Sequence, residues 1–181
     1  MNRLFDRLPD RQSTLSVYAF AVFIVYSWTL FTSFWKIPSW IYYLKLSDLI
    51  AIYSYSFLVN FIESGILLGI SILLCLVLPQ KFWKKGFVSK SVAFIGTLMG
   101  SIFYRIIQFI DPNLRREFVS GQQKWILITL TLIIIVILIT SCVEWIRIRI
   151  EHISERFIIF LYLYLPLTAI ALFVIIIRVI V

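Results

Sequence analysis

The sequence predicts an all-α integral membrane protein that crosses the bilayer five times, and three observations support this fold class. The chain is 61% hydrophobic and 14% charged, whereas soluble domains are about 45–50% apolar and about 25% charged. Its mean hydropathy is +0.98. Several apolar runs of span length carry almost no charge, and a helix satisfies its own backbone hydrogen bonds in hydrocarbon. We therefore expect one transmembrane domain that covers residues 1–181.

Five apolar runs define the expected spans, which are Leu15–Trp35, Leu49–Leu78, Ser91–Ile110, Trp125–Trp145 and Phe157–Val181. The first run is too long for the core of a signal peptide and lacks a small-residue cleavage pattern, so we expect it to remain as a span. Lys36, Ile37 and Pro38 are expected to end the first span, and Asp48 is expected to cap the second.

The distribution of lysine and arginine predicts the orientation, because cytoplasmic connections carry an excess of both residues. One side of the predicted topology holds Arg3, Arg7, Arg11, Lys81, Lys84, Lys85, Lys90, Arg147, Arg149 and Arg156. The other side holds fewer basic residues, which are Lys36, Lys45, Arg115, Arg116, Lys124 and Arg178. The pattern favours a cytoplasmic N-terminus and an external C-terminus in a cell membrane.

Two pairs of glycines have the spacing of helix contact surfaces. Gly65 and Gly69 lie four residues apart in the second span, and Gly96 and Gly100 do so in the third. Glycines at this spacing allow a second helix to approach closely. The pairs predict packing either within this chain or against another membrane chain.

The second and third spans also carry polar stripes. At 100° per residue, Asn60 and Glu63 fall on one face of the second span, and Arg105 and Gln108 fall on one face of the third. A charge at such depth costs about 3 kcal/mol even on insertion scales, so it should face protein, water or an opposite charge. We therefore expect Glu63 to contact Arg105. The four residues either line a substrate or ion path or form an internal polar clasp.

A basic aromatic cluster follows the second span, where Lys81, Trp83, Lys84 and Lys85 are expected to contact anionic lipid head groups. Further along, the run from Trp145 to Phe157 alternates isoleucine with charge, which predicts that the fourth span continues as a helix into the cytoplasm.

No catalytic, metal-binding or cofactor-binding constellation is apparent. His152 is the only histidine and lies outside the predicted spans, which argues against haem ligated by two histidines. Cys75 and Cys142 lie inside apolar runs without CxxC spacing, so both read as core residues rather than as metal ligands. Net charge is +8, but no segment is long enough to present a basic surface to nucleic acid. We expect no cofactor and no nucleic-acid partner.

The sequence therefore favours a non-enzymatic subunit of a membrane complex whose partners are lipids and other membrane chains, or copies of itself. The alternative is a small oligomeric carrier or channel with a polar path along the second and third spans, where Arg105 would favour an anionic or amphiphilic substrate. A third hypothesis is an enzyme that acts on lipid-linked substrates, with Glu63 as acid or base and Arg105 as phosphate ligand.

Overall fold

The computed structural model is all-helical and describes residues 8–79, 83–84, 86–110 and 121–180. Its long helices are α2 (Arg11–Tyr43), α3 (Leu46–Val77), α5 (Phe87–Ile110), α7 (Gln122–Cys142) and α9 (Ile158–Ile180), with the shorter α8 (Glu144–Arg156) between α7 and α9. Within the described residues, five helical segments are long and apolar enough to cross a membrane. The prediction of an all-α, five-span protein is confirmed.

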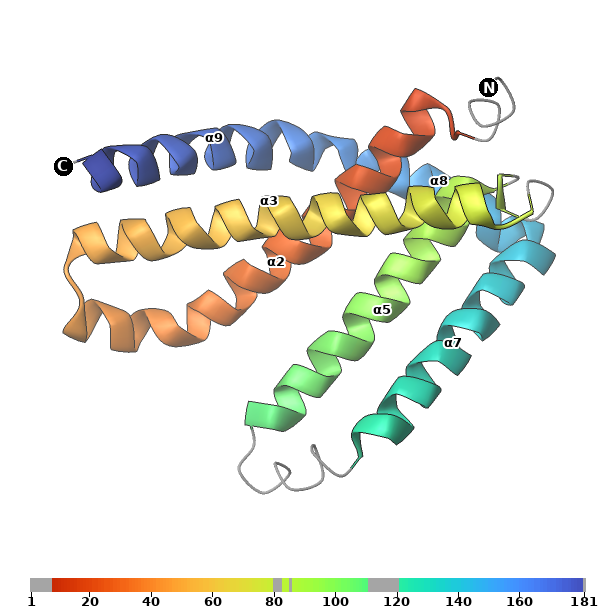
Figure 1. Ribbon diagram of the computed structural model, residues 1–181, viewed down its shortest axis with the longest axis horizontal. Helices are drawn as coiled ribbons and strands as arrows, with labels where there is room; N and C mark the ends of the chain where they lie inside the picture. Colours follow the sequence, from red (N-terminus) through yellow and green to blue (C-terminus); the bar gives the residue numbers. More distant parts are fainter. Residues whose placement is uncertain (1–7, 80–82, 85, 111–120, 181) are drawn as a thin grey trace.

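Helix α2 lies at the centre of the arrangement and contacts α3, α5, α8 and α9. Figure 1 shows two groups of helices, one formed by α2, α3 and α9 and the other by α5 and α7, which diverge from α8 at one end. Helices α3 and α5 contact each other far less than either contacts α2. The molecule is therefore open between α3 and α5.

Small residues on α2 allow this dense packing. Val17, Ala21 and Val25 face a core cluster that includes Leu67 of α3 and Ile95 of α5. Ala19, Val22 and Tyr26 face a second cluster with Leu161 and Tyr164 of α9. Because side chains three and four residues apart share a helix face, these alternating sets give α2 two packing faces.

A buried hydroxyl joins three of the helices. The Tyr26 hydroxyl lies 3.1 Å from the Phe57 carbonyl oxygen and 2.5 Å from Thr168 Oγ1. Thr168 Oγ1 in turn donates to the carbonyl of Tyr164. Hydrogen bonds of this kind between membrane helices contribute about 0.6 kcal/mol on average. Tyr26 thus fixes the register of α2 against α3 and α9.

The predicted end of the first span is wrong. Helix α2 continues through Lys36 and Pro38 to Tyr43, and its last turns bend away from the main axis (Figure 1). Proline in a helix removes one backbone donor and produces a bend rather than an end when the flanking residues remain helical. At 33 residues the helix is about 50 Å long, which exceeds a hydrocarbon core of about 30 Å.

Asp48 does not cap the second span, since α3 begins two residues earlier and its N-cap residue, Lys45, makes no side-chain capping bond. Asp48 lies in the first turn instead, where a negative charge interacts favourably with the helix dipole. Its Oδ1 accepts a hydrogen bond of 3.3 Å from Arg178 Nη2 near the end of α9. The pair joins the first turn of α3 to the last turn of α9.

The fourth span does not continue straight into the next helix. Val143 has an extended conformation (φ −102, ψ 100), which separates α7 from α8. Helix α8 packs across α5 and α2. Gly86, with φ +86, precedes α5 at this contact, and a Cβ there would lie 3.0 Å from Arg147 Cδ. Glycine is required at this position both for the backbone angle and for the approach of α8.

Candidate functional site: a cavity between α2, α3 and α5

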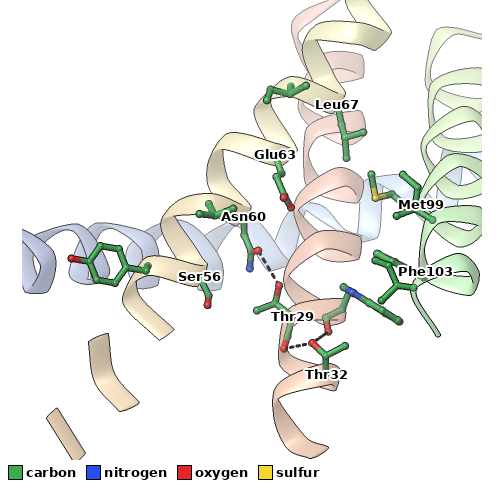
Figure 2. Close-up of a pocket in the computed structure, with 14 residues that line it drawn as sticks. Thr29, Thr32, Ser56, Asn60, Glu63, Leu67, Met99 and Phe103 are labelled. Carbon is green, nitrogen blue, oxygen red and sulfur yellow. Dashed lines mark hydrogen bonds between the residues drawn. The ribbon is translucent and has the colours of Figure 1, made fainter. Parts of the chain in front are cut away.

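The opening between α3 and α5 contains a cavity of about 630 Å³. This volume lies within the range of about 300–1,000 Å³ that small-molecule sites occupy. The lining residues come from three helices and are Trp28, Thr29, Thr32, Tyr55, Ser56, Val59, Asn60, Glu63, Ile66, Leu67, Met99, Ile102, Phe103 and Ile106. Figure 2 shows Asn60 and Glu63 on one wall, with Met99 and Phe103 on the facing wall.

Asn60 lines the cavity and is 4% exposed. Its Oδ1 accepts a hydrogen bond of 2.9 Å from Thr29 Oγ1, which links α3 to α2 (Figure 2). Its Nδ2 atom is buried and has no hydrogen-bond partner among the described residues. An unsatisfied buried donor costs about 1–3 kcal/mol, so an acceptor that reaches Nδ2 from the cavity that Asn60 lines would relieve this cost.

Glu63 lies one turn further along α3, close to the middle of that helix, and its side chain is exposed to the cavity. The ion pairs between described side chains join Arg147 to Glu144 and Arg178 to Asp48, and neither involves Glu63. The cavity is thus lined by a carboxyl group at a depth where a charge requires compensation.

The wall opposite Glu63 is aromatic. Trp28 of α2 stacks on Phe103 of α5 with ring centroids 4.0 Å apart and an interplanar angle of 6°. Thr32, one turn after Trp28, donates to the carbonyl oxygens of Trp28 and Thr29, so its hydroxyl hydrogen is used within α2. The stacked rings hold α2 and α5 together at the cavity and add aromatic carbon to its lining.

The predicted contact between Glu63 and Arg105 is wrong. Arg105 Nη1 donates to Gln108 Oε1 at 2.9 Å, and its guanidinium lies over the ring of Trp125, 5.9 Å from the centroid. The polar stripe of α5 therefore faces α7, as the 2.6 Å hydrogen bond between Ser101 and Thr129 also shows.

The four residues predicted to act together are accordingly divided. Asn60 and Glu63 line the cavity, whereas Arg105 and Gln108 do not belong to its lining. Helix α5 presents an apolar face to the cavity, formed by Met99, Ile102, Phe103 and Ile106. An arginine placed away from the cavity removes the reason to expect an anionic substrate there.

The glycine pairs make little contact within the chain. A Cβ added at Gly65, Gly69 or Gly100 would meet nothing within 4 Å, and one at Gly96 would lie 3.7 Å from Phe20. Among the described residues, packing within the chain is thus found at Gly96 and not at the other three glycines. Gly65 and Gly69 are exposed on a face of α3 away from the cavity.

The basic aromatic cluster is only partly described, because Lys81 and Lys85 lie outside the described residues. Trp83 is 1% exposed and belongs to the core cluster with Cys75 and Phe87. It is therefore enclosed by protein, and its predicted contact with lipid head groups is wrong. Lys84 is exposed.

Of the two cysteines, Cys75 is buried as expected, whereas Cys142 is exposed.

Helix α2 also contributes to the site, which the polar stripes in the sequence do not indicate. Trp28, Thr29 and Thr32 all line the cavity, and none of them belongs to a predicted stripe. The position of Trp28 is the one sequence signal for this contribution. It is the tryptophan furthest from any expected span boundary. Tryptophan favours membrane interfaces, so a tryptophan at mid-span indicates a local packing or binding role.

The described residues contain no group of three or more His, Cys, Asp or Glu side chains that could hold a metal ion. The cavity can compensate a positive charge through Glu63 and donate a hydrogen bond through Asn60.

Comparisons of the chain with protein-family models, with curated proteins and with solved structures give no match to any of them.

Proposed function

We propose that this multi-pass membrane protein is a non-enzymatic subunit of a membrane complex, and that it packs against a different transmembrane chain through the face of α3 that carries Gly65 and Gly69. The observation that supports the proposal is the open space at both glycines. The spacing is that of a close helix contact, and no described helix of this chain makes that contact.

The physical argument rests on how helices associate in lipid. Lipid tails are as apolar as leucine, so membrane helices gain little from apolar burial and depend on close van der Waals packing between small residues. Glycine within a helix costs about 0.5–1 kcal/mol relative to alanine. A partner helix that packs on Gly65 and Gly69 offsets this cost, whereas loosely packed lipid does not.

The same proposal includes an orientation with the N-terminus in the cytoplasm. Trp145 of α8 is 62% exposed, and the Arg149 guanidinium lies 4.2 Å from its ring centroid. Lys84, which precedes α5, and Arg147 of α8 lie at the same end of the molecule. Tryptophan and basic side chains are favoured at the level of anionic lipid head groups. This end is accordingly proposed to lie at the cytoplasmic surface of a cell membrane.

Leucine at both glycines is expected to release the partner. Purified in mild detergent from its native membrane, the tagged wild-type protein should carry another polypeptide in stoichiometric amount. The Gly65→Leu/Gly69→Leu variant should lose at least about 90% of it, because overpacking of a close contact costs about 1–3 kcal/mol. The measurement is the mass of each recovered complex.

The matched control is Ile62→Leu/Leu73→Ile, which exchanges side chains that are 54% and 58% exposed on the same helix. This variant should keep the partner. Recovery of the wild-type protein as a lone monomer, or with copies of itself only, would contradict the proposal.

A second candidate function, a small carrier or channel, is favoured by one specific observation, the cavity that contains Asn60 and Glu63. The polar path in this version comprises these two residues together with Thr29 and Ser56, and excludes Arg105 and Gln108. Flux of a solute that depends on Glu63 in proteoliposomes would favour transport over the subunit role.

A further inference from the structure

We infer that the cavity between α2, α3 and α5 is a binding site for a small amphiphilic amine, in which an ammonium group pairs with Glu63 and a hydroxyl or carbonyl oxygen of the same molecule accepts a hydrogen bond from Asn60. This inference does not depend on the proposed subunit role. It is based on four features of the cavity: the carboxyl group of Glu63, the Nδ2 donor of Asn60 that has no partner among the described residues, the aromatic wall and the apolar rim.

The charge of the ligand follows from Glu63. Its carboxyl group lines the cavity near the middle of α3, and no cation among the described residues pairs with it. A carboxylate at this depth is stabilised by an opposite charge, and an ammonium group supplies that charge together with N–H donors.

The oxygen acceptor follows from Asn60. Its Oδ1 is bonded to Thr29, while Nδ2 is buried without a partner among the described residues. Asn60 and Glu63 lie three residues apart on one helix, which places their side chains about one turn apart on neighbouring positions of the same face. A molecule that carries an ammonium group and an oxygen a few bonds apart matches this spacing.

The apolar part of the ligand follows from the facing wall. Trp28 and Phe103 form a flat stacked pair, and Met99 lies beside them in the lining. Aromatic faces attract cations and stack on other rings, and a thioether packs favourably against rings. An aromatic body attached to the amine fits this surface.

The rim indicates access from the bilayer. Val59, Ile66 and Ile106 border the cavity and are 50%, 56% and 38% exposed. Exposed aliphatic side chains at the depth of the hydrocarbon face lipid tails. The ligand thus reaches the cavity by first partitioning into the membrane, which requires an amphiphile rather than a hydrophilic ion.

A lysine from a partner helix is the main alternative occupant, and the chemistry of Asn60 argues against it. A lysine ammonium offers donors and no acceptor. It can therefore pair with Glu63 but leaves the Asn60 Nδ2 donor unsatisfied. A small amine that also carries an oxygen satisfies both groups.

Propranolol is a suitable probe, because it combines a secondary amine, a hydroxyl group and a fluorescent naphthalene ring. Binding is measured by fluorescence titration of the full-length protein in phosphatidylcholine nanodiscs, with empty nanodiscs as background. The wild-type protein should bind one probe per chain saturably. The neutral analogue, in which a hydroxyl group replaces the amine, should bind at least about tenfold more weakly, as expected for the loss of a charge-assisted hydrogen bond.

Two variants test the residues. Glu63→Gln should weaken propranolol binding at least about tenfold and leave binding of the neutral analogue unchanged, and Asn60→Leu should weaken binding of both compounds about fivefold. Glu155→Gln is the control, since Glu155 is exposed on α8 and does not line this cavity. It should behave as wild type.

The comparison of amine and neutral analogue on the wild-type protein keeps the test decisive if a variant fails to fold. Three results would overturn the inference: no saturable binding above empty nanodiscs, equal affinity for the amine and the neutral analogue, or amine binding that is unaffected by Glu63→Gln. A partner chain that is released from purified protein by Glu63→Gln, with no probe binding to the free protein, would assign the cavity to a basic residue of that chain. Failure of the subunit proposal leaves the probe-binding readouts unchanged.

Discussion

Replacement of Trp28 with alanine is expected to lower the free energy of unfolding by about 2–3 kcal/mol, because an aromatic residue truncated in a protein interior typically costs about 3–5 kcal/mol and Trp28 is half-buried. The stacked contact with Phe103, at 4.0 Å between centroids, is lost with the ring. Such aromatic pairs add about 0.5–1.5 kcal/mol beyond their buried area. Since α3 and α5 make little direct contact, this pair is a principal link between the two helix groups at the level of the cavity.

Trp35→Ala is the matched control, because Trp35 lies on the same helix and is 78% exposed. Substitutions at such surface positions usually change stability by less than about 0.5 kcal/mol. The measurement is reversible unfolding in mixed detergent micelles, followed by the near-ultraviolet and far-ultraviolet circular dichroism. Equal losses in Trp28→Ala and Trp35→Ala would show that the stacked pair does not hold the two groups together.

Leucine in place of Ala21 is expected to destabilise the protein by about 1–3 kcal/mol, since extra carbon atoms in a packed core force side chains and backbone to move. Ala21 is 0% exposed and belongs to the cluster that joins α2 to α3 and α5. The variant should also lower the yield of folded protein, because α2 contacts four other helices.

Ala169→Leu is the appropriate comparison, because the same chemical change is made at an exposed position of α9. Added apolar surface that faces lipid should be nearly neutral. The two variants are compared in the same unfolding assay as above. A larger loss in Ala169→Leu than in Ala21→Leu would contradict the central position of α2.

The number and class of the helices could be predicted from the sequence because their cause is local. A long apolar run must close its own hydrogen bonds in lipid, whatever its neighbours are. All five expected spans correspond to helices. The predicted end of the first span, at Pro38, was less accurate. A proline marks either the end of a helix or a bend in it, and the outcome depends on whether the residues beyond it also form a helix. Here the residues beyond it, such as Trp40 and Tyr43, are helical.

The candidate site was predicted only in part, because a polar stripe shows which residues share a helix face and not which helix that face meets. Asn60 and Glu63 were found by their stripe on α3. The stripe on α5 was equally clear, but it faces α7, where Ser101 bonds to Thr129. Adjacent spans were expected to pair their stripes, yet α5 packs mainly against α7 and α2. Only tertiary structure distinguishes these arrangements.

The glycine pairs illustrate the same limit. Their spacing predicted close approach, and the sequence left open whether the approach occurs within the chain or between chains. Gly96 lies against Phe20 of α2, whereas Gly65 and Gly69 remain open. The two motifs therefore differ at one position, because α2 reaches Gly96 of α5 while no described helix covers the glycine face of α3.

The central claim, a five-span bundle with the start of α2 and α8 on one side of the membrane, is tested most directly by the side on which single cysteines react. Cys75 and Cys142 are first replaced by alanine. Asp10→Cys, Lys45→Cys, Gln122→Cys and Arg149→Cys each place one thiol at an exposed position next to a span. Intact cells are then treated with a membrane-impermeant maleimide, before and after permeabilisation.

We expect Lys45→Cys and Gln122→Cys to react in intact cells, and Asp10→Cys and Arg149→Cys to react only after permeabilisation. The reverse pattern would overturn the proposed orientation while it preserves the five spans. Reaction of Asp10→Cys and Lys45→Cys from the same side would contradict the account, because α2 would then not cross the membrane.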